Sequence, residues 1–196
     1  MIKKIRTLNS LTRIVLQIIK AELIYFMFGQ RALSNYIRKI DNPLYLLKYL
    51  GVQIGKDTNI WPGITLNCEN RKKYKLLKIG KSVRILWDVI IDLNDEIDIG
   101  DYTHIGTRSI LITHFNLGKS PLGKTEYPYI EGPIKIGKGS VISWGTTVLH
   151  DTEIGEHTII SSGSIINGKI PSFCVFGGNP GRPIKKITPQ NPEDFK

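Results

Sequence analysis

Aliphatic residues recur at every sixth position through much of this chain, and this period constrains the fold more than any other feature. The longest unbroken series has six members: Ile136, Ile142, Val148, Ile154, Ile160 and Ile166. A period of six matches neither the 3.6-residue turn of a helix nor the two-residue alternation of a strand. It fits a short strand followed by a tight turn, with one aliphatic side chain per unit pointing into a narrow core.

Three such units make one triangular coil of about eighteen residues, so the sequence predicts a mainly β, parallel β-helix. Equivalent isoleucines then stack from coil to coil at about the 4.8 Å spacing of neighbouring strands. About five coils fit between Ile54 and Pro171. Serine or threonine often stands four residues after the aliphatic, where a small side chain suits a crowded corner. Glycine often follows the aliphatic directly, as in Ile54-Gly55, and we expect it to permit turn conformations that other residues resist.

The repeat is interrupted at residues 71–78 and again at residues 112–133. It also slips by two residues at Ile97-Asp98. The second break is about 22 residues long, and loops of that length in compact domains are usually functional or disordered. This break contains a single histidine, His114.

The net charge of +10 is concentrated near the N-terminus. Residues 1–50 contain nine basic and two acidic side chains, a balance of +7, so the other 146 residues carry +3. A basic balance can indicate nucleic acid or an anionic surface. No helix-turn-helix, zinc-finger or ribonucleoprotein motif accompanies the charge, so we do not expect nucleic acid as a partner.

The same basic segment is predicted to be helical. Apolar residues from Leu11 to Met27 share one helical stripe, but the apolar run 14–28 is shorter than the roughly 20 residues that span a bilayer. Residues 1–51 are therefore expected to form either a helical cap on the β-helix or a basic amphipathic segment that contacts an anionic membrane.

The expected helix boundaries follow from glycine and proline. Gly29 is a plausible stop for the first helix, and a second helix is expected over residues 31–40. Asn42-Pro43 resembles a helix start with proline at the first helical position, and Gly51 ends that short helix.

Cysteine usage bears on location. Two cysteines, Cys68 and Cys174, cannot make a disulfide framework, which favours a reducing, cytoplasmic setting. The apolar run is not followed by a small-residue cleavage site, so a signal peptide is not expected. The basic N-terminal segment leaves the inner face of the membrane open as a place of attachment.

The closing repeats resemble a known family. Residues 136–166, followed by Ile-Pro-Ser-Phe at 170–173 and by the segment 177–185, are similar to the last coils and exit segment of hexapeptide-repeat acyltransferases of the sugar O-acetyltransferase and xenobiotic acetyltransferase group. The resemblance implies a left-handed β-helix in residues 52–187, a C-terminal tail in 188–196, and a homotrimer. The left hand comes from the resemblance alone, because the general rule for parallel crossovers would give the right hand.

The resemblance also implies a catalytic histidine in the long loop, and His114 matches that role. A neutral imidazole can take the proton of a sugar hydroxyl as the hydroxyl attacks a thioester. Registry of about eighteen residues places Asn94 one coil below His114, with Asp92 on the same side of that strand, so either could orient the imidazole. The other histidines, His104, His150 and His157, are expected at outward or turn positions.

The donor implied by the resemblance is acetyl-coenzyme A (acetyl-CoA), lying in a groove between subunits along the corners of the last coils. The predicted contacts are Ser143, Trp144, Gly145, Ser162, Gly163, Asn167 and Gly168, with Arg182, Lys185 and Lys186 facing the cofactor phosphates. Trp144 replaces the small residue usual in the family, so its indole could stack on the donor or merely cover the groove.

The sequence thus predicts an acetyl-CoA-dependent O-acetyltransferase that acts on a sugar or on a precursor of capsule, O-antigen or exopolysaccharide. A non-catalytic scaffold, or an acyltransferase for an amino sugar or antibiotic, are the alternatives. A zinc carbonic anhydrase on the same repeat is disfavoured, because the histidine spacings do not match and no metal is expected. Serine acetylation is disfavoured, because the large helical domain of those enzymes does not fit into fifty residues.

Overall fold

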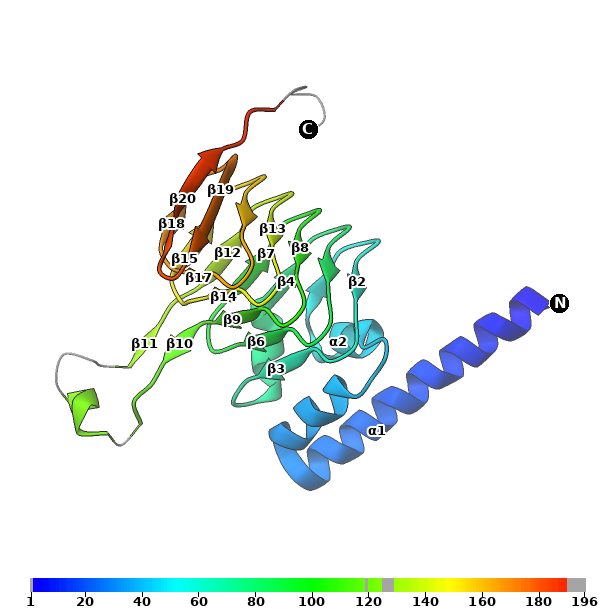
Figure 1. The fold of residues 1–196 in the computed structure, drawn as a ribbon. Coiled ribbons are helices and arrows are strands. Elements are labelled where there is room, and N and C mark those ends of the chain that lie inside the picture. The colour runs from blue at the N-terminus through cyan, green and yellow to red at the C-terminus, as the bar shows by residue number, and fades with distance from the viewer. Residues whose placement is uncertain (1, 119, 125–128, 190–196) are drawn as a thin grey trace.

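The computed structural model describes residues 2–118, 120–124 and 129–189. Three sheets form the three faces of a β-helix, and their strands are parallel except for β20, which pairs antiparallel with β19 (Figure 1). The first face contains β1 (Gln53–Ile54), β4 (Leu77–Ile79), β7 (Ile97–Ile99), β12 (Ile134–Ile136), β15 (Thr152–Ile154) and β18 (Lys169–Ile170). The second face contains β2 (Asn59–Ile60), β5 (Arg84–Ile85), β8 (His104–Ile105), β13 (Val141–Ile142), β16 (Ile159–Ile160), β19 (Cys174–Gly178) and β20 (Gly181–Lys186). The third face contains β3 (Thr65–Asn67), β6 (Ile90–Asp92), β9 (Ile110–Ile112), β14 (Thr147–Val148) and β17 (Ile165–Ile166).

The six-residue period produces the core as predicted. Ile54 pairs in register with Ile79, Ile79 with Ile99, and Ile99 with Ile136, so equivalent isoleucines stack along the first face. The repeat isoleucines from Ile79 to Ile166 are at most 4% exposed. Ile99 and Ile136 pair although the long break separates them in the sequence, so the break leaves the register of the first face intact.

The Ile-Gly glycines have a different role from the expected one. The left-handed backbone lies at the third residue after the repeat aliphatic: Asp57, Gly63, Ser82, Asp88, Tyr102, Arg108, Gly139, Gly145, His157 and Gly163. The glycine directly after the isoleucine is needed for close approach instead. A Cβ on Gly106 would lie 2.7 Å from the backbone nitrogen of Trp144 in the next coil, and one on Gly137 would lie 2.6 Å from that of Glu156.

Buried hydroxyls link several coils to the coil that follows, although the coil of β4–β6 has Val83 and Val89 at these positions. Thr58 Oγ1 donates to the carbonyl of Gly80 at 2.7 Å, Ser140 Oγ to that of Gly155 at 2.7 Å, and Thr158 Oγ1 to that of Pro171 at 2.8 Å. These are the Ser/Thr positions four residues after the aliphatic. Each hydroxyl satisfies a carbonyl at the corner of the next coil, which explains the choice of a small polar side chain there.

Two corners of the β-helix differ in construction. The corner between the second and third faces has the same short turn in each complete coil, and we call it the regular corner. The corner between the third and first faces holds the 3₁₀ helix η1 (Arg71–Leu76), the turn 93–96 and the long insertion 113–133. We call it the irregular corner. Both breaks of the six-residue period fall on the irregular corner.

The N-terminal helix α1 (Ile2–Arg38) bends sharply at Gly29, whose backbone is non-helical at φ 75° and ψ −169°. We call residues 2–28 the first arm and residues 30–38 the second arm. The predicted helix break at Gly29 is confirmed. Helix α2 (Leu44–Leu50) ends at Gly51, which is left-handed at φ 107°, as predicted. Pro43 occupies the capping position, one residue earlier than expected.

The second arm and α2 cover the lower end of the β-helix. Leu33, Ile37 and Leu47 are fully buried, and Ser34 Oγ donates to the carbonyl of Leu66 at 2.7 Å. The first arm leads away from the β-helix (Figure 1). No helix in the described part of the chain is long and apolar enough to cross a membrane.

Candidate functional site

The long break forms a projecting hairpin on the irregular corner. Strand β10 (His114–Phe115) pairs antiparallel with β11 (Ile130–Glu131), and the 3₁₀ helix η2 (Pro121–Lys124) lies farther out (Figure 1). His114 stands at the root of this hairpin, opposite Glu131. Its backbone is therefore fixed by the β-helix on one side and by the hairpin ladder on the other.

His114, Asp92 and Asn94 lie together, as the registry predicts. Asp92 pairs with Ile112 in the neighbouring strand, which places Asn94 beside His114. The Nδ1 atom of His114 is 2.7 Å from Asp92 Oδ2 and 2.9 Å from Asn94 Nδ2. Asn94 Nδ2 also lies 3.0 Å from Asp92 Oδ1. The Asp92 side chain is 12% exposed and that of His114 is 31% exposed, so the carboxylate is enclosed while the ring reaches the surface.

The contact with Asp92 selects one tautomer of His114, and the approach of Asn94 Nδ2 to Nδ1 is then not a hydrogen bond. A carboxylate can only accept, so His114 Nδ1 carries the hydrogen and donates it to Asp92 Oδ2. Asn94 then donates from Nδ2 to Asp92 Oδ1. His114 Nε2 is left with its lone pair, and no described residue hydrogen-bonds to it. The arrangement can therefore accept a proton at Nε2 while Asp92 stabilises the resulting imidazolium.

Thr113 is a residue of this site that the sequence analysis missed. It is fully buried, and both its backbone N–H and its Oγ1 lie within 3.1 Å of Asp92 Oδ2. The same hydroxyl accepts from the backbone N–H of Asn94 at 2.9 Å. Thr113 therefore holds the Asp92 carboxylate and the Asn94 turn in a fixed relation. Its position directly before His114 was the available signal.

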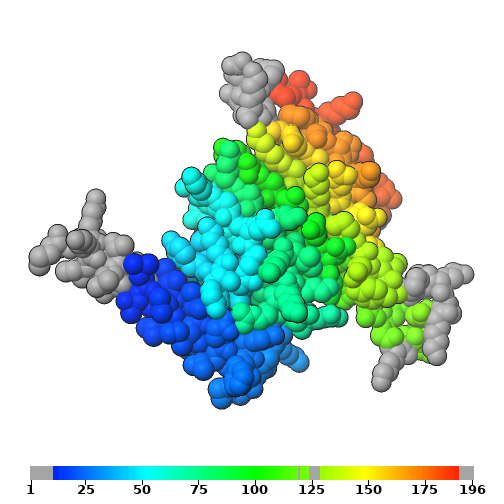
Figure 2. All heavy atoms as spheres, turned by 180° about the vertical axis from the view of Figure 1, so that it is seen from behind, coloured from blue at the N-terminus to red at the C-terminus, as the bar shows by residue number. Residues whose placement is uncertain are grey.

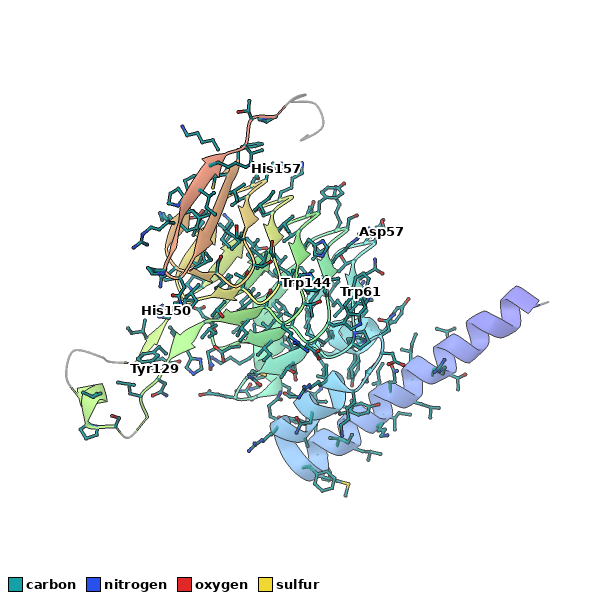
Figure 3. All side chains as sticks on the ribbon, viewed as in Figure 1. Asp57, Trp61, Tyr129, Trp144, His150 and His157 are labelled. Atoms are coloured by element: carbon teal, nitrogen blue, oxygen red, sulfur yellow. The ribbon has the colours of Figure 1, made fainter. Side chains whose placement is uncertain are left out.

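Tyr129 flanks His114 from the far strand of the hairpin. The two ring centroids are 6.1 Å apart, and the Tyr129 hydroxyl donates to Glu131 Oε2 at 2.6 Å. This bond to a carboxylate is the main reason why the pKa of Tyr129 rises to about 12. Tyr129 therefore stays a protonated hydrogen-bonding group through the physiological range. Figure 3 shows Tyr129 at the outer end of β11.

A polar pocket lies beside this cluster, between the second arm and β3. It has a volume of about 490 Å³ and is lined by Gln30, Arg31, Ser34, Asn35, Thr65, Asn67, Cys68 and Glu69. Asn67 pairs in register with Asp92, and Asp92 pairs with Ile112, so the pocket sits one coil below Asp92 and two coils below His114. The sequence analysis did not foresee this pocket, because it forms only when the helix folds back at Gly29.

The predicted donor residues fall into three places within this chain. Ser143, Trp144 and Ser162 line a groove of about 300 Å³ at the regular corner, together with His104 and Gly106. Gly145 and Gly163 occupy the open left-handed positions of the same corner. Asn167 and Gly168 lie after β17 on the irregular corner, and Arg182, Lys185 and Lys186 lie on β20. One subunit alone does not bring these groups around a common ligand.

Exposed indoles follow the regular corner. Trp144 is 63% exposed and Trp87 is 46% exposed, and Trp87 packs on Trp61 with ring centroids 5.8 Å apart. Figure 3 shows Trp61 and Trp144 on the β-helix, away from the hairpin that carries Tyr129. The sequence analysis identified Trp144 but not its two companions.

The other three histidines lie at outward or turn positions, as predicted, and all three are half-buried. Burial lowers the pKa of His104, and the charge of Arg84 lowers it further. His150 Nδ1 is buried without a partner among the described residues, and His157 packs on Phe173 with centroids 5.1 Å apart. Within the ranges that the structure describes, no three His, Cys, Asp or Glu side chains form a group that could hold a metal ion.

Known proteins share this sequence pattern, although no family model matches the chain. A protein of Bacillus subtilis strain 168, named provisionally as the acetyltransferase YvoF, is 26% identical over 158 residues, which cover 80% of this chain and 86% of that protein. Serine acetyltransferase 2 of Arabidopsis thaliana is 27% identical, but the match covers only 34% of its length. Mitochondrial gamma carbonic anhydrase 1 of the same plant is 29% identical, with 44% of its length covered.

Solved structures confirm the left-handed β-helix. A hexapeptide-repeat acetyltransferase of Vibrio cholerae, solved with acetyl-CoA, superposes with a TM-score of 0.65 at 19% identity and covers 92% of this chain and 90% of that one. A galactoside acetyltransferase solved with CoA also gives 0.65, at 18% identity, with 89% and 82% covered. A GDP-perosamine N-acetyltransferase of Caulobacter crescentus gives 0.51 at 18% identity, with 69% and 51% covered.

Proposed function

We propose that this chain is an acetyltransferase of the hexapeptide-repeat family, to which it is similar, and that it transfers the acetyl group of acetyl-CoA to a hydroxyl group of a sugar or glycan precursor. The observation that carries the proposal is the hydrogen bond of 2.7 Å between His114 Nδ1 and Asp92 Oδ2. It leaves Nε2 as the basic atom of a half-exposed imidazole, beside a pocket lined by polar side chains.

The proposed reaction is direct transfer. His114 Nε2 takes the proton of the acceptor hydroxyl while that oxygen attacks the thioester carbonyl. The tetrahedral intermediate collapses, the carbon–sulfur bond breaks, and the imidazolium returns the proton to the departing thiolate. The products are an O-acetyl ester and CoA with a free thiol. Asp92 and Asn94 are positioning residues in this scheme, since they act through the His114 ring.

The pocket below His114 is the proposed acceptor site. Its lining provides amide, hydroxyl, guanidinium and carboxylate groups, which match the donors and acceptors of a sugar. A sugar hydroxyl needs a general base, and the lone pair on His114 Nε2 supports that role for His114. An amino sugar is the second candidate, because one structurally similar protein is named a GDP-perosamine N-acetyltransferase.

The donor site is proposed to be completed by a neighbouring subunit. His114 lies on the irregular corner, whereas the groove at Trp144 lies on the regular corner of the same coils. A homotrimer would set one corner against the other and bring the predicted donor contacts to the histidine. The size of the particle in solution, measured by light scattering, tests this part of the proposal.

The central test is thiol release from acetyl-CoA with a panel of sugar and amino-sugar acceptors. We expect His114→Ala to lower kcat by about 10² to 10⁴-fold, with CoA binding intact. His157→Asn is the matched control, because asparagine tolerates the left-handed backbone at that position. Unchanged turnover in His114→Ala would refute the role of His114. A wild-type chain that neither binds CoA nor acetylates any acceptor would favour the scaffold alternative.

A further inference from the structure

The first arm of α1 carries a large apolar face that the described part of the chain leaves uncovered. More than half of each side chain is exposed in Leu11, Val15, Ile19, Leu23, Phe26 and Met27, with Phe26 at 89%. Spacings of three and four residues put these side chains on one side of the helix. The opposite side faces the protein, where Ala21 is buried and Tyr25 is half-buried. Figure 2 shows this arm at the edge of the molecule, outside the β-helix.

The charge of α1 distinguishes among the surfaces that could cover this face. Its sequence contains seven basic residues and one acidic residue, Glu22. Glu22 is already paired, since both of its carboxylate oxygens accept from Arg71 at 2.7 and 2.8 Å. Arg13 and Lys20 are exposed beside the apolar face. The helix therefore offers apolar area flanked by cations with no free carboxylate among the described side chains.

We propose that the first arm lies flat on an anionic lipid surface, with its apolar face among the acyl chains and its basic residues at the headgroups. Anionic headgroups complement the charge of the helix, and an amphipathic basic helix binds by this combination of terms. A second copy of the same arm would bring cations against cations, which opposes helix pairing. The charge therefore selects an anionic bilayer as the occupant.

The bend at Gly29 connects this surface to the acceptor pocket. Three consecutive exposed apolar residues, Phe26 to Phe28, end the first arm, and Gln30 and Arg31 follow directly as lining of the pocket. The pocket therefore opens beside the lipid-facing end of the arm. If the pocket binds a sugar, as the proposed function states, this placement favours a glycan attached to a lipid. The lipid binding itself does not depend on the acetyltransferase activity.

The test is flotation of the full chain with vesicles of phosphatidylglycerol and phosphatidylcholine, and with phosphatidylcholine alone. We expect binding to the anionic vesicles that weakens as salt increases. The double variant Leu23→Ser/Phe26→Ser should lower the partition constant at least about tenfold. The control Tyr102→Ser/Ile184→Ser removes two exposed apolar side chains, 52% and 59% exposed, from other faces, and it should bind like the wild type.

Several outcomes would overturn the proposal. Wild-type protein that does not float with anionic vesicles at low salt would do so, as would equal flotation of the Leu23→Ser/Phe26→Ser variant. A loss of self-association in that variant, with no vesicle binding by the wild type, would assign the face to a second copy. Turnover of a water-soluble acceptor without vesicles should be the same in wild type and variant. Absence of turnover in both would count against the proposed function and leave the lipid result standing.

Discussion

The regular and irregular corners of the same coils have opposite roles. At the regular corner the turn repeats, with a left-handed residue at a fixed place such as Gly63, Gly145 or Gly163. At the irregular corner nearly every coil has a different connection. The polar pocket beside the second arm, the Asn94 turn and the hairpin lie one above another at this corner. At the regular corner, the buried hydroxyls of Ser109 and Thr146 donate to carbonyls of the next coil. Where the period breaks, polar side chains are free to face a ligand.

The largest expected effect tests the irregular corner. Asp92→Asn removes the charge that holds His114 Nδ1–H and stabilises the imidazolium, so kcat/KM should fall about 100-fold or more. Thr113→Val removes only the hydroxyl that positions the carboxylate, and the fall should be about tenfold. Acetyl-CoA assays with both variants measure this order. Full activity in Asp92→Asn would show that His114 does not depend on its partner.

Substitutions among the stacked isoleucines of the β-helix should change the stability of the protein and not its catalytic activity. Ile142 is fully buried in the stack of the second face, so Ile142→Ala should lower the free energy of unfolding by about 3 kcal/mol. Ile184, which is 59% exposed, provides the control, and its change to alanine should cost less than about 0.5 kcal/mol. Urea unfolding measures both. Similar losses would mean that the stacked isoleucines are not the main support of the fold.

Two glycines of the regular corner should differ for a structural reason. Gly106→Ala places a methyl group 2.7 Å from the backbone nitrogen of Trp144, and we expect a loss of about 2 kcal/mol. Gly145→Ala meets open space and suffers only from its left-handed φ of 66°, so the loss should be about 1 kcal/mol. The reverse order in thermal unfolding would contradict the close-approach explanation of the Ile-Gly motif.

The smallest effect concerns a thiol of the irregular corner. Burial raises the pKa of the Cys68 thiol to about 11, so little thiolate exists at pH 7. Iodoacetamide should therefore modify Cys68 slowly at pH 7 in the folded protein. The rate should rise about tenfold per pH unit until pH approaches that pKa. Mass spectrometry of a Cys174→Ala variant follows this site alone, and rapid labelling at pH 7 would contradict the burial.

The sequence predicted the stacked isoleucines of the β-helix and the partners of His114 for the same reason. Stacking in register converts a count of residues into a neighbour in space, so Asp92 and Asn94 could be named before any coordinates. The proposed acceptor pocket could not be named, because Gln30 and Asn67 meet only when the helix bends back at Gly29. The donor contacts at Trp144 and on β20 stay predictions, since they depend on a neighbouring chain. The position of the left-handed residue was wrong by two places, because crowding by the next coil also selects glycine.

The hydroxyl–carbonyl hydrogen bonds of Thr58, Ser140 and Thr158 run in one direction along the β-helix. Thr58, Ser140 and Thr158 each donate to a carbonyl of the coil that comes later in the sequence. A coil that carries such a donor therefore lacks the partner carbonyl until the next coil has been synthesised. The growing end behaves as a template that accepts one specific next layer, while the helices made first already close the other end. Synthesis in the N-to-C direction thus builds the β-helix in the same order in which its hydrogen bonds can be satisfied.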